Sequence, residues 1–383
     1  MTDVPDEAEL QRLGLYDPKA PGADDLLKVV RLAFELGATP EEAVEAARIG
    51  ALGDLALDLA MRPPGVTQDL DTFADASDDP DLVRQMWRAL GLPEDGPVRV
   101  TPDMAEGLRL LVAASATFTP GTALALARVV GSSCARMAEA LVSAVRVDVE
   151  VPSRVSGAPY SESARENTAA ARELLPPFLD AVNAVFRRHM VLFAYYIWST
   201  DEERTAVTHT RTVGFADLVG STEAVRAGSI PALAANVRQF EELAWDVVTR
   251  AGGRVVKLIG DEAMFVVEDP SRACALALDL VERSPHPIRV GLAQGTVVAL
   301  YGDYYGETVN LAARLVDVAE PWAIAVSDSV RRLAGGSPSF SFDDLGRHAL
   351  KGFGDHVTVH RVTRLPLDDE TMDGSRREGG PAA

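Results

Sequence analysis

The chain contains very little cysteine. Only two of its 383 residues are cysteines, Cys134 and Cys274, and they lie in different halves of the sequence. Two cysteines placed so far apart exclude a disulfide framework and a Cys-x-x-Cys metal knuckle, and such scarcity is typical of reducing compartments. The first residues, MTDVPDE, lack the basic and then apolar pattern of a signal peptide. We therefore expect a cytoplasmic protein.

The chain is also poor in positive charge and in long apolar runs. Its 37 lysines and arginines face 57 aspartates and glutamates, which gives a formal net charge of -20. Nucleic acids and anionic membranes need a basic surface, so we expect neither as a partner. The most apolar stretch, MVLFAYYIW at 190–198, is far shorter than the roughly 20 residues that span a bilayer.

The sequence to about residue 203 has a helical pattern. Apolar residues at 26–37 recur with the helical period, and TPEE at 39–42 provides a cap, a first-turn proline and a capping-box glutamate. Longer patterns predict helices at 121–145 and 161–200, separated by a break at 147–161. Pro176-Pro177 predicts a kink or restart in the second of these helices.

Residues 67–93 have the pattern of a helix-turn-helix. Reading DNA would need basic residues on and around the second helix. That helix has Arg84 and Arg88, and six acidic residues lie close to them in the sequence: Asp69, Asp71, Asp75, Asp78, Asp79 and Asp81. We therefore interpret this segment as a structural helix pair.

From about residue 205, strand-like runs alternate with helical ones. This pattern predicts an α+β domain of the ferredoxin-like βαββαβ kind after an all-α N-terminal region. The expected strands are 210–219, 254–259, 263–268, 288–300, 323–326, 340–350 and 357–363, and the expected helices are 231–251, 272–283 and 308–318. The predicted division is a helical domain at 1–160, a coupling helix and linker at 161–204, an α+β domain at 205–365 and a disordered tail at 366–383.

Two aspartates end apolar runs in this second half. Asp217 precedes Gly220, Ser221 and Thr222, which could bring backbone amides close to a phosphate, although an aspartate before a glycine is also a common turn. Asp261 lies at the tip of a predicted hairpin, where turn chemistry is an equal explanation. Two such carboxylates with substrate phosphates can hold a pair of divalent cations.

A third motif follows in GDYYGETVNLAAR at 302–314. Asn310 and Arg314 are four residues apart and therefore lie on one face of a helix. A carboxamide and a guanidinium on one face suit a developing phosphoryl charge and its leaving group. An exposed polar stripe is the alternative interpretation.

The order of these motifs resembles the catalytic domain of class III nucleotidyl cyclases over about 205–364. The motifs at 215–220 and 257–261 match, Asp303 lies seven residues before Asn310, and Arg314 lies four after it. Ser221 departs from the pattern, since many relatives have an aromatic residue there. The resemblance implies an adenylate cyclase that converts ATP to 3′,5′-cyclic AMP and pyrophosphate with Mg²⁺ or Mn²⁺, two ions per site.

The resemblance also implies a role for each matching residue. Asp217 and Asp261 match the metal ligands, and Asn310 and Arg314 match the residues that orient the ribose and stabilise the transition state. Lys257 matches the donor to adenine N1, and Asp303 matches the acceptor for the 6-amino group. Guanine presents the opposite pattern, so this pair favours ATP. The best candidate for a triphosphate-binding lysine is Lys351, in LKGF.

In this family the active site forms between two catalytic domains, so the resemblance implies a homodimer with two shared sites. The hairpin with Lys257 and Asp261 would then contribute to both sites. The first half resembles, more loosely, helical regulatory regions of actinobacterial members, and we treat it as a regulatory and dimerising module. His189 and His209 flank the junction and are either proton sensors or solvated surface residues. A small apolar effector near Phe193, Tyr195 and Trp198 is a further hypothesis.

Three alternatives remain open on the sequence. A catalytically silent cyclase-like module would bind nucleotide or dimerise without turnover, although it would not need the full residue set. Lys257 and Asp303 disfavour a guanylate cyclase, and the acidic charge disfavours a transcription regulator that uses 67–93.

Overall fold

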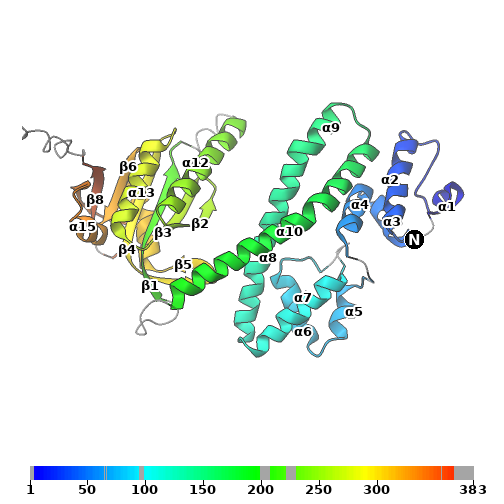
Figure 1. Cartoon of the computed structure of the whole chain (residues 1–383), viewed down its shortest axis with the longest axis horizontal. Coiled ribbons are helices and arrows are strands. Elements are labelled where there is room, and N and C mark those ends of the chain that lie inside the picture. Colours follow the sequence, from blue (N-terminus) through cyan, green and yellow to red (C-terminus); the bar gives the residue numbers. More distant parts are fainter. Residues whose placement is uncertain are drawn as a thin grey trace, which may run out of the picture. The chain divides into compact units, whose positions relative to one another are not determined.

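The structure of the protein, a computed structural model, describes residues 4–63, 65, 67–94, 99–198, 208–220, 230–354 and 356–365. The chain divides into two compact units, Met1–Ser199 and Thr200–Ala383. The first is helical, and the second is a mixed α/β unit (Figure 1). This confirms the predicted fold class. Ser221, Thr222 and the expected tail at 366–383 lie outside the described residues.

One group of helices in the first unit packs around the start of a very long helix. The group consists of α1 Glu7–Arg12, α2 Ala23–Glu35, α3 Pro40–Arg48 and α4 Leu52–Met61, and the long helix is α10 Tyr160–Trp198. Thr39 and Glu42 form the predicted capping box of α3. The hydroxyl of Tyr160 accepts a hydrogen bond from the Gly53 amide at 3.0 Å, which attaches the start of α10 to α4.

A second group of helices has its own core around Trp87. It consists of α5 Leu70–Asp75, α6 Pro80–Ala89, α7 Pro102–Ala113 and the first part of α8 Pro120–Val145. The two arginines of the predicted helix-turn-helix make ion pairs on this surface: Arg84 contacts Asp71 and Asp75, and Arg88 contacts Glu94. These pairs support the structural interpretation of the segment, because the cations that DNA would need are already neutralised.

The structure confines the expected break at 147–161 to residues 156–159, around Gly157 and Pro159, and shows no restart of the helix at Pro176-Pro177. After α8, helical geometry continues through a π-helix, Arg146–Glu150, and through α9, Val151–Val155. Pro152 lies inside this continuous segment and is exposed, so water can satisfy the carbonyl that lacks its backbone donor. Helix α10 also continues through Pro176 and Pro177. Both prolines are exposed, so water can satisfy the carbonyls that lose their helical partners.

The second unit is built on an eight-stranded sheet with the order β2-β3-β1-β4-β6-β8-β7, and β5 is attached to β4. The strands are β1 Thr208–Leu218, β2 Arg254–Ile259, β3 Glu262–Val267, β4 Ile288–Leu300, β5 Asp303–Tyr305, β6 Ala323–Ser327, β7 Phe340–His348 and β8 Val357–Arg364. Strands β4 and β6 are parallel, and the other pairs are antiparallel. The short strand β5 was missed because three residues give no periodic signal.

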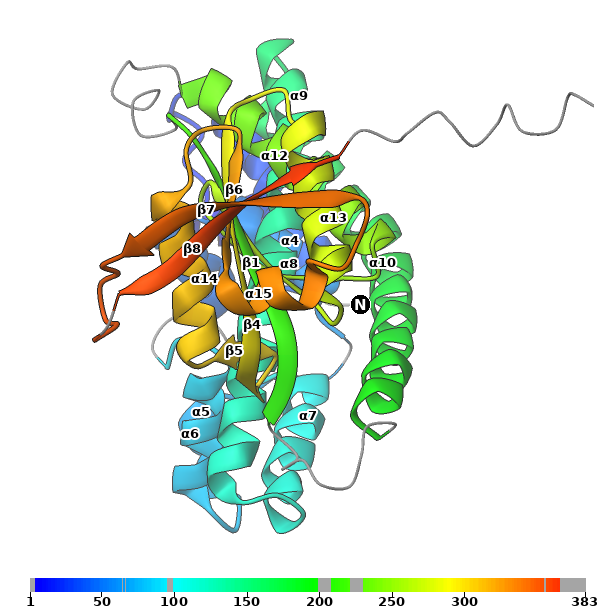
Figure 2. The same cartoon turned by 90° about the vertical axis from the view of Figure 1, so that its left-hand side faces the viewer.

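Helices cover the two faces of this sheet unequally. Helices α12 Ile230–Arg250, α13 Pro270–Arg283 and α15 Asp328–Ala334 pack on one face, with Ala216 and Leu218 of β1 in the same core. Helix α14 Glu307–Val318 packs on the other face, with Val213 and Phe215; in Figure 2, α14 and α13 lie on opposite sides of the strands. Side chains alternate along a strand, so Asp217 belongs to the face that α14 covers.

No helix within the described ranges is long and apolar enough to cross a membrane.

Candidate active site

Asp217 lies at the end of β1, between two charged neighbours. In the strand register it is opposite Glu262 of β3 on one side and Arg289 of β4 on the other. Directly opposed residues point to the same face of a sheet, so the three side chains share the face of α14. Nη2 of Arg289 donates a hydrogen bond to Oδ2 of Asp217 at 2.8 Å.

Asp261 is brought to the same end of the sheet by its backbone. The Leu218 amide donates a hydrogen bond to the Asp261 carbonyl oxygen at 3.1 Å. Gly260, with a φ of 65°, makes the tight turn between β2 and β3 possible. The two aspartates that the sequence predicts as metal ligands are therefore neighbours, although 44 residues separate them in the chain.

Asp217, Asp261 and Glu262 give this end of the sheet an excess of negative charge. Burial raises the pKa of Asp217, Asp261 raises it further, and the Arg289 hydrogen bond opposes both effects. Burial and the charges of Asp217 and Asp261 raise the pKa of Glu262 to about 7. Carboxylates that resist ionisation because of one another are stabilised when a cation joins them.

Hard oxygen donors of this kind fit Mg²⁺ or Mn²⁺. In the described part of the chain, no three His, Cys, Asp or Glu side chains converge as a complete protein cage would need. Mg²⁺ does not require such a cage, since it is commonly held by one or two carboxylates together with substrate phosphates and water. The donor set at Asp217 and Asp261 therefore fits a metal that arrives with a phosphorylated substrate.

Arg289 is a candidate site residue that the sequence analysis missed. Its Nε is buried and has no hydrogen-bond partner among the described residues. A guanidinium that pairs with Asp217 on one side and has a spare buried N–H suits an oxyanion such as phosphate. The available signal was an arginine inside the otherwise apolar run IRVGLA at 288–293.

Lys257 and Asp303, the predicted base-reading pair, meet in the structure. Nζ of Lys257 on β2 donates to Oδ2 of Asp303 on β5 at 2.5 Å. Both side chains are partly exposed, at 35% and 26%, so a planar ring could reach them from solvent. Their meeting brings together a donor and an acceptor that are 46 residues apart in the chain.

Asn310 and Arg314 both lie on α14, as expected from their spacing. Asn310 is exposed, and Arg314 is 43% exposed and lies 3.7 Å from Asp317. Lys351 is exposed in the turn between β7 and β8. Among the described residues, no hydrogen bond or ion pair joins Lys351, Asn310 or Arg314 to the other predicted site residues.

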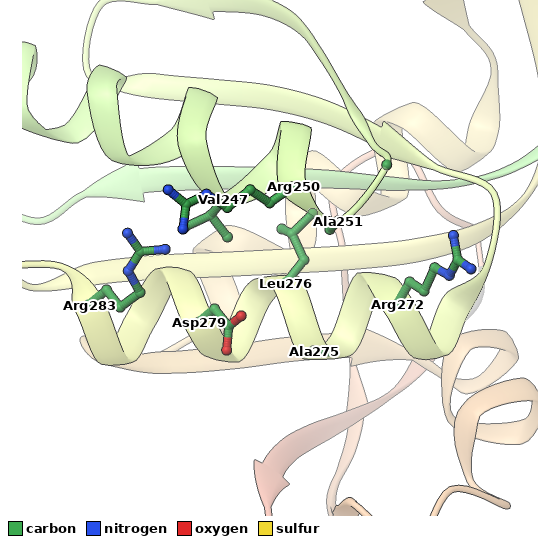
Figure 3. A pocket seen from close by; sticks show the side chains of 9 residues that line it. Val247, Arg250, Ala251, Arg272, Ala275, Leu276, Asp279 and Arg283 are labelled. Atoms are coloured by element: carbon green, nitrogen blue, oxygen red, sulfur yellow. The ribbon is translucent and has the colours of Figure 1, made fainter.

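A cavity of about 590 Å³ lies elsewhere, between α12 and α13. Figure 3 shows Val247, Leu276 and arginines such as Arg250 and Arg283 around it. These helices cover the face opposite to α14, and no predicted site residue lines the cavity. Arg250 and Arg283 both pair with Asp246.

Comparison with known proteins agrees with these motifs. The family described as the Adenylate and Guanylate cyclase catalytic domain matches residues 204–363. An uncharacterized protein of Mycobacterium tuberculosis is 34% identical over 92% of this chain and 93% of its own. The chain belongs to the class III nucleotidyl cyclase family. An adenylate cyclase of Streptomyces coelicolor is 32% identical, over 64% of this chain and 66% of its own.

The mycobacterial relative aligns with the helical unit of this class III cyclase as well as with its catalytic region. Among solved structures, the adenylyl cyclase CyaB from P. aeruginosa is 23% identical over 42% of this chain and 97% of its own, with a TM-score of 0.38. Because the family match spans residues 204–363, the second unit is a cyclase catalytic domain, and this confirms the resemblance that the sequence motifs indicated.

Proposed function

We propose that this cyclase is an adenylate cyclase that converts ATP to 3′,5′-cyclic AMP and pyrophosphate. The observation that supports this substrate best is the contact between Lys257 and Asp303. A lysine N–H can donate to adenine N1 while a carboxylate accepts from the 6-amino group. Guanine, with N1–H and O6, would set its donor against the lysine donor and its acceptor against the carboxylate, and such a mismatch disfavours the ligand.

The other predicted residues fit the same reaction. Mg²⁺ or Mn²⁺ bound at Asp217 and Asp261 would activate the ribose 3′-hydroxyl and neutralise phosphate charge. Arg289 would bind phosphate oxygens, Asn310 would orient the ribose, and Arg314 would stabilise the charge that develops on the phosphorus. The 3′-oxygen bonds to the α-phosphorus, the bond to the bridging oxygen breaks, and pyrophosphate leaves.

The proton of the 3′-hydroxyl has no obvious protein acceptor. Asp217 and Asp261 act as metal ligands in this proposal, so their carboxylates are not free bases. Water or a substrate phosphate oxygen would accept the proton. Lys351 remains a proposed triphosphate ligand on the strength of the LKGF motif alone.

We further propose that the active protein is a homodimer with shared sites. Exposed apolar residues surround the hairpin tips near Lys257 and Asp303: Ile259, Leu300, Tyr301 and Tyr305. Two chains docked head to tail would cover these residues, and would bring the α14 residues of one chain to the metal ligands of the other. Association would also explain why, in the part of one chain that the structure describes, no hydrogen bond or ion pair joins Asn310 or Arg314 to the other site residues.

The helical unit is proposed to regulate this dimer. Helix α10 ends next to the linker that leads into the catalytic domain, so a shift of α10 could change how two catalytic domains meet. The effector stays a prediction: His189 stacks on Phe193 with ring centroids 6.0 Å apart, and either a proton or a small apolar molecule could act there. Removal of residues 1–203 and assay across pH would test regulation, and an unchanged rate and pH profile would contradict it.

One assay tests the central proposal. Purified full-length protein is incubated with ATP or GTP and Mg²⁺ or Mn²⁺, and the cyclic nucleotide is quantified by chromatography. We expect cyclic AMP and a clear preference for ATP. Cyclic GMP as the main product would indicate the guanylate alternative. Binding of nucleotide without any product would indicate the catalytically silent module.

A further inference from the structure

The turn that presents Asp303 is conformationally unfavourable on its own. Strands β4 and β5 are joined by Tyr301 and Gly302, whose φ angles are 52° and 84°. Two consecutive positive φ angles are typical of a type I′ hairpin turn, which favours asparagine or glycine at both positions. Tyr301 has a β-carbon that disfavours this conformation. The turn therefore needs support from outside the hairpin.

Arg254, the first residue of β2, provides two contacts to this turn. Its Nη2 donates a hydrogen bond to the Gly302 carbonyl oxygen at 3.0 Å. Its guanidinium carbon lies 5.2 Å from the centre of the Tyr304 ring, within the range of a cation–π interaction. Gly302 and Tyr304 are the two chain neighbours of Asp303, so Arg254 contacts the backbone on one side of that aspartate and the aromatic ring of its neighbour on the other.

The Asp303 carboxylate is itself fully oriented by hydrogen bonds. Oδ1 accepts from the Tyr304 amide at 2.8 Å, and Oδ2 accepts from Nζ of Lys257 at 2.5 Å. Arg254 and Lys257 belong to the same strand, β2. A single strand thus provides both the partner of Asp303 and the residue that fixes the turn around it.

From this geometry we infer that Arg254 is a positioning residue for base selection. It holds the β4–β5 turn so that Asp303 stays within reach of Lys257, and it thereby contributes to the preference for ATP over GTP. The inference rests on the proposed function, because it presumes that Lys257 and Asp303 contact the base. Arg254 is not assigned any contact with the substrate.

The chemistry of the guanidinium explains why arginine suits this position. A planar guanidinium can stack on Tyr304 and still direct an N–H to the Gly302 carbonyl, whereas a lysine ammonium is a hydrated point charge. Base selection depends on both partners being in place. A turn that moves by a fraction of an ångström would weaken the hydrogen bond of the correct base and relax the exclusion of the wrong one.

The test compares Arg254→Gln and Arg254→Lys with a matched control, Arg272→Gln. Arg272 is an exposed arginine on α13 that lies 4.0 Å from Asp269, and it is outside the proposed site. For each protein, kcat and KM are measured for ATP and for GTP over a range of metal concentrations. Binding of fluorescent ATP and GTP analogues in Ca²⁺ gives a readout that does not need turnover.

We expect Arg254→Gln to raise KM for ATP and to reduce the ATP:GTP ratio of kcat/KM by roughly threefold to tenfold, the effect of one lost hydrogen bond. Arg254→Lys should lie between this variant and the wild type. The metal dependence should not change, because Asp217 and Asp261 are not touched. Hydrogen exchange should become faster at 301–305 in Arg254→Gln but not in Arg272→Gln, and Tyr304→Phe, which keeps the ring, should resemble the wild type.

Four outcomes are distinguishable. A reduced ATP:GTP ratio with normal thermal stability supports the inference. An unchanged ratio in an active Arg254→Gln enzyme overturns it and leaves the proposed function intact. If the wild type makes no cyclic nucleotide but prefers the ATP analogue in binding, the proposed function fails and the binding ratio of the variant still decides the inference. If the wild type binds neither analogue, both are overturned.

Discussion

The two units of this cyclase differ in how they bury their apolar side chains. In the catalytic unit, helices cover both faces of the sheet, and large residues such as Phe240, Phe265 and Leu292 are almost fully buried. In the helical unit, the long helices from α8 to α10 leave many large apolar residues exposed: Val130, Val142, Val147, Val155, Leu179, Val185, Phe186, Met190 and Val191.

The difference indicates what each unit lacks. The catalytic unit has a complete core, but its proposed site residues fall into separate groups within one chain. The helical unit has two small cores at the starts of its long helices, and the remainder of those helices has an unpartnered apolar surface. Such surfaces are typical of sites that another molecule covers. A second copy of the chain would complete both units, which is the occupant that the proposed homodimer requires.

The largest expected effect is a difference in thiol reactivity between the two cysteines, one in each unit. Cys134 on α8 is exposed, whereas Cys274 on α13 is fully buried. Burial raises the pKa of Cys274 to about 12, so its thiolate fraction at pH 8 should be lower by about 10³-fold than that of an ordinary thiol. Reaction with a disulfide reagent should modify Cys134 quickly and Cys274 only after denaturation. Equal rates in the native protein would contradict the closed core of the catalytic unit.

The next prediction tests whether one catalytic unit needs a second chain to form its active site. Asp217→Ala and Arg314→Ala should each reduce cyclase activity by about 10²–10³-fold, since each removes a charge that the transition state needs. Mixing the two inactive proteins should restore activity, because a mixed dimer contains one site with both residues. Wild-type mixed with either variant is the control for subunit exchange. No recovery on mixing, with exchange demonstrated, would mean that the site is not shared.

A smaller effect is expected from the apolar surface of α10. Phe186→Glu should weaken self-association by about tenfold, because it places a charge on a surface proposed to be buried between chains. Leu110→Glu is a matched control, since Leu110 on α7 is similarly exposed, at 66% against 62% for Phe186. Sedimentation velocity across a range of protein concentrations measures the change. Equal dimerisation of both variants would show that α10 contacts no second copy.

The smallest expected effect is a pH dependence of stability caused by Glu262, which lies beside Asp217 and Asp261 in the catalytic unit. The pKa of Glu262 rises from 4.5 to about 7 on folding, so the folded state binds more protons between those values. Stability of the metal-free protein should therefore fall as pH rises from 4.5 to 7, by about 1 kcal/mol after solvent screening of this half-buried group. Glu262→Gln should weaken this dependence in thermal unfolding with EDTA, whereas Glu268→Gln, an exposed control, should retain it in full.

Much of the catalytic unit was predictable from local patterns. The strands around Asp217 and Asp261 are bounded apolar runs, and the spacing of Asn310 and Arg314 determines their common helix face. Arg289 and Arg254 were not predictable in this way. Each is significant only because of a residue far away in the chain, Asp217 for the first and Gly302 for the second.

In the helical unit, local patterns predicted interruptions at positions where the structure remains helical. Prolines at 152 and 176 predicted a break and a kink, because proline removes a backbone donor. Helical geometry nevertheless continues through both positions. These prolines are exposed, so water can satisfy the carbonyls that lose their helical partners. The sequence pattern cannot show whether a proline lies on the exposed side of a helix.

The sequence alone therefore determined the family, the fold class and the identity of the chemical groups, because these depend on periodicity, spacing and residue type. Only the tertiary structure decided which groups meet. It places Asp217 beside Arg289, Asp261 beside the end of β1, and Lys257 on Asp303. Such pairs depend on sheet register and strand order, which are fixed by how the whole chain buries its apolar surface.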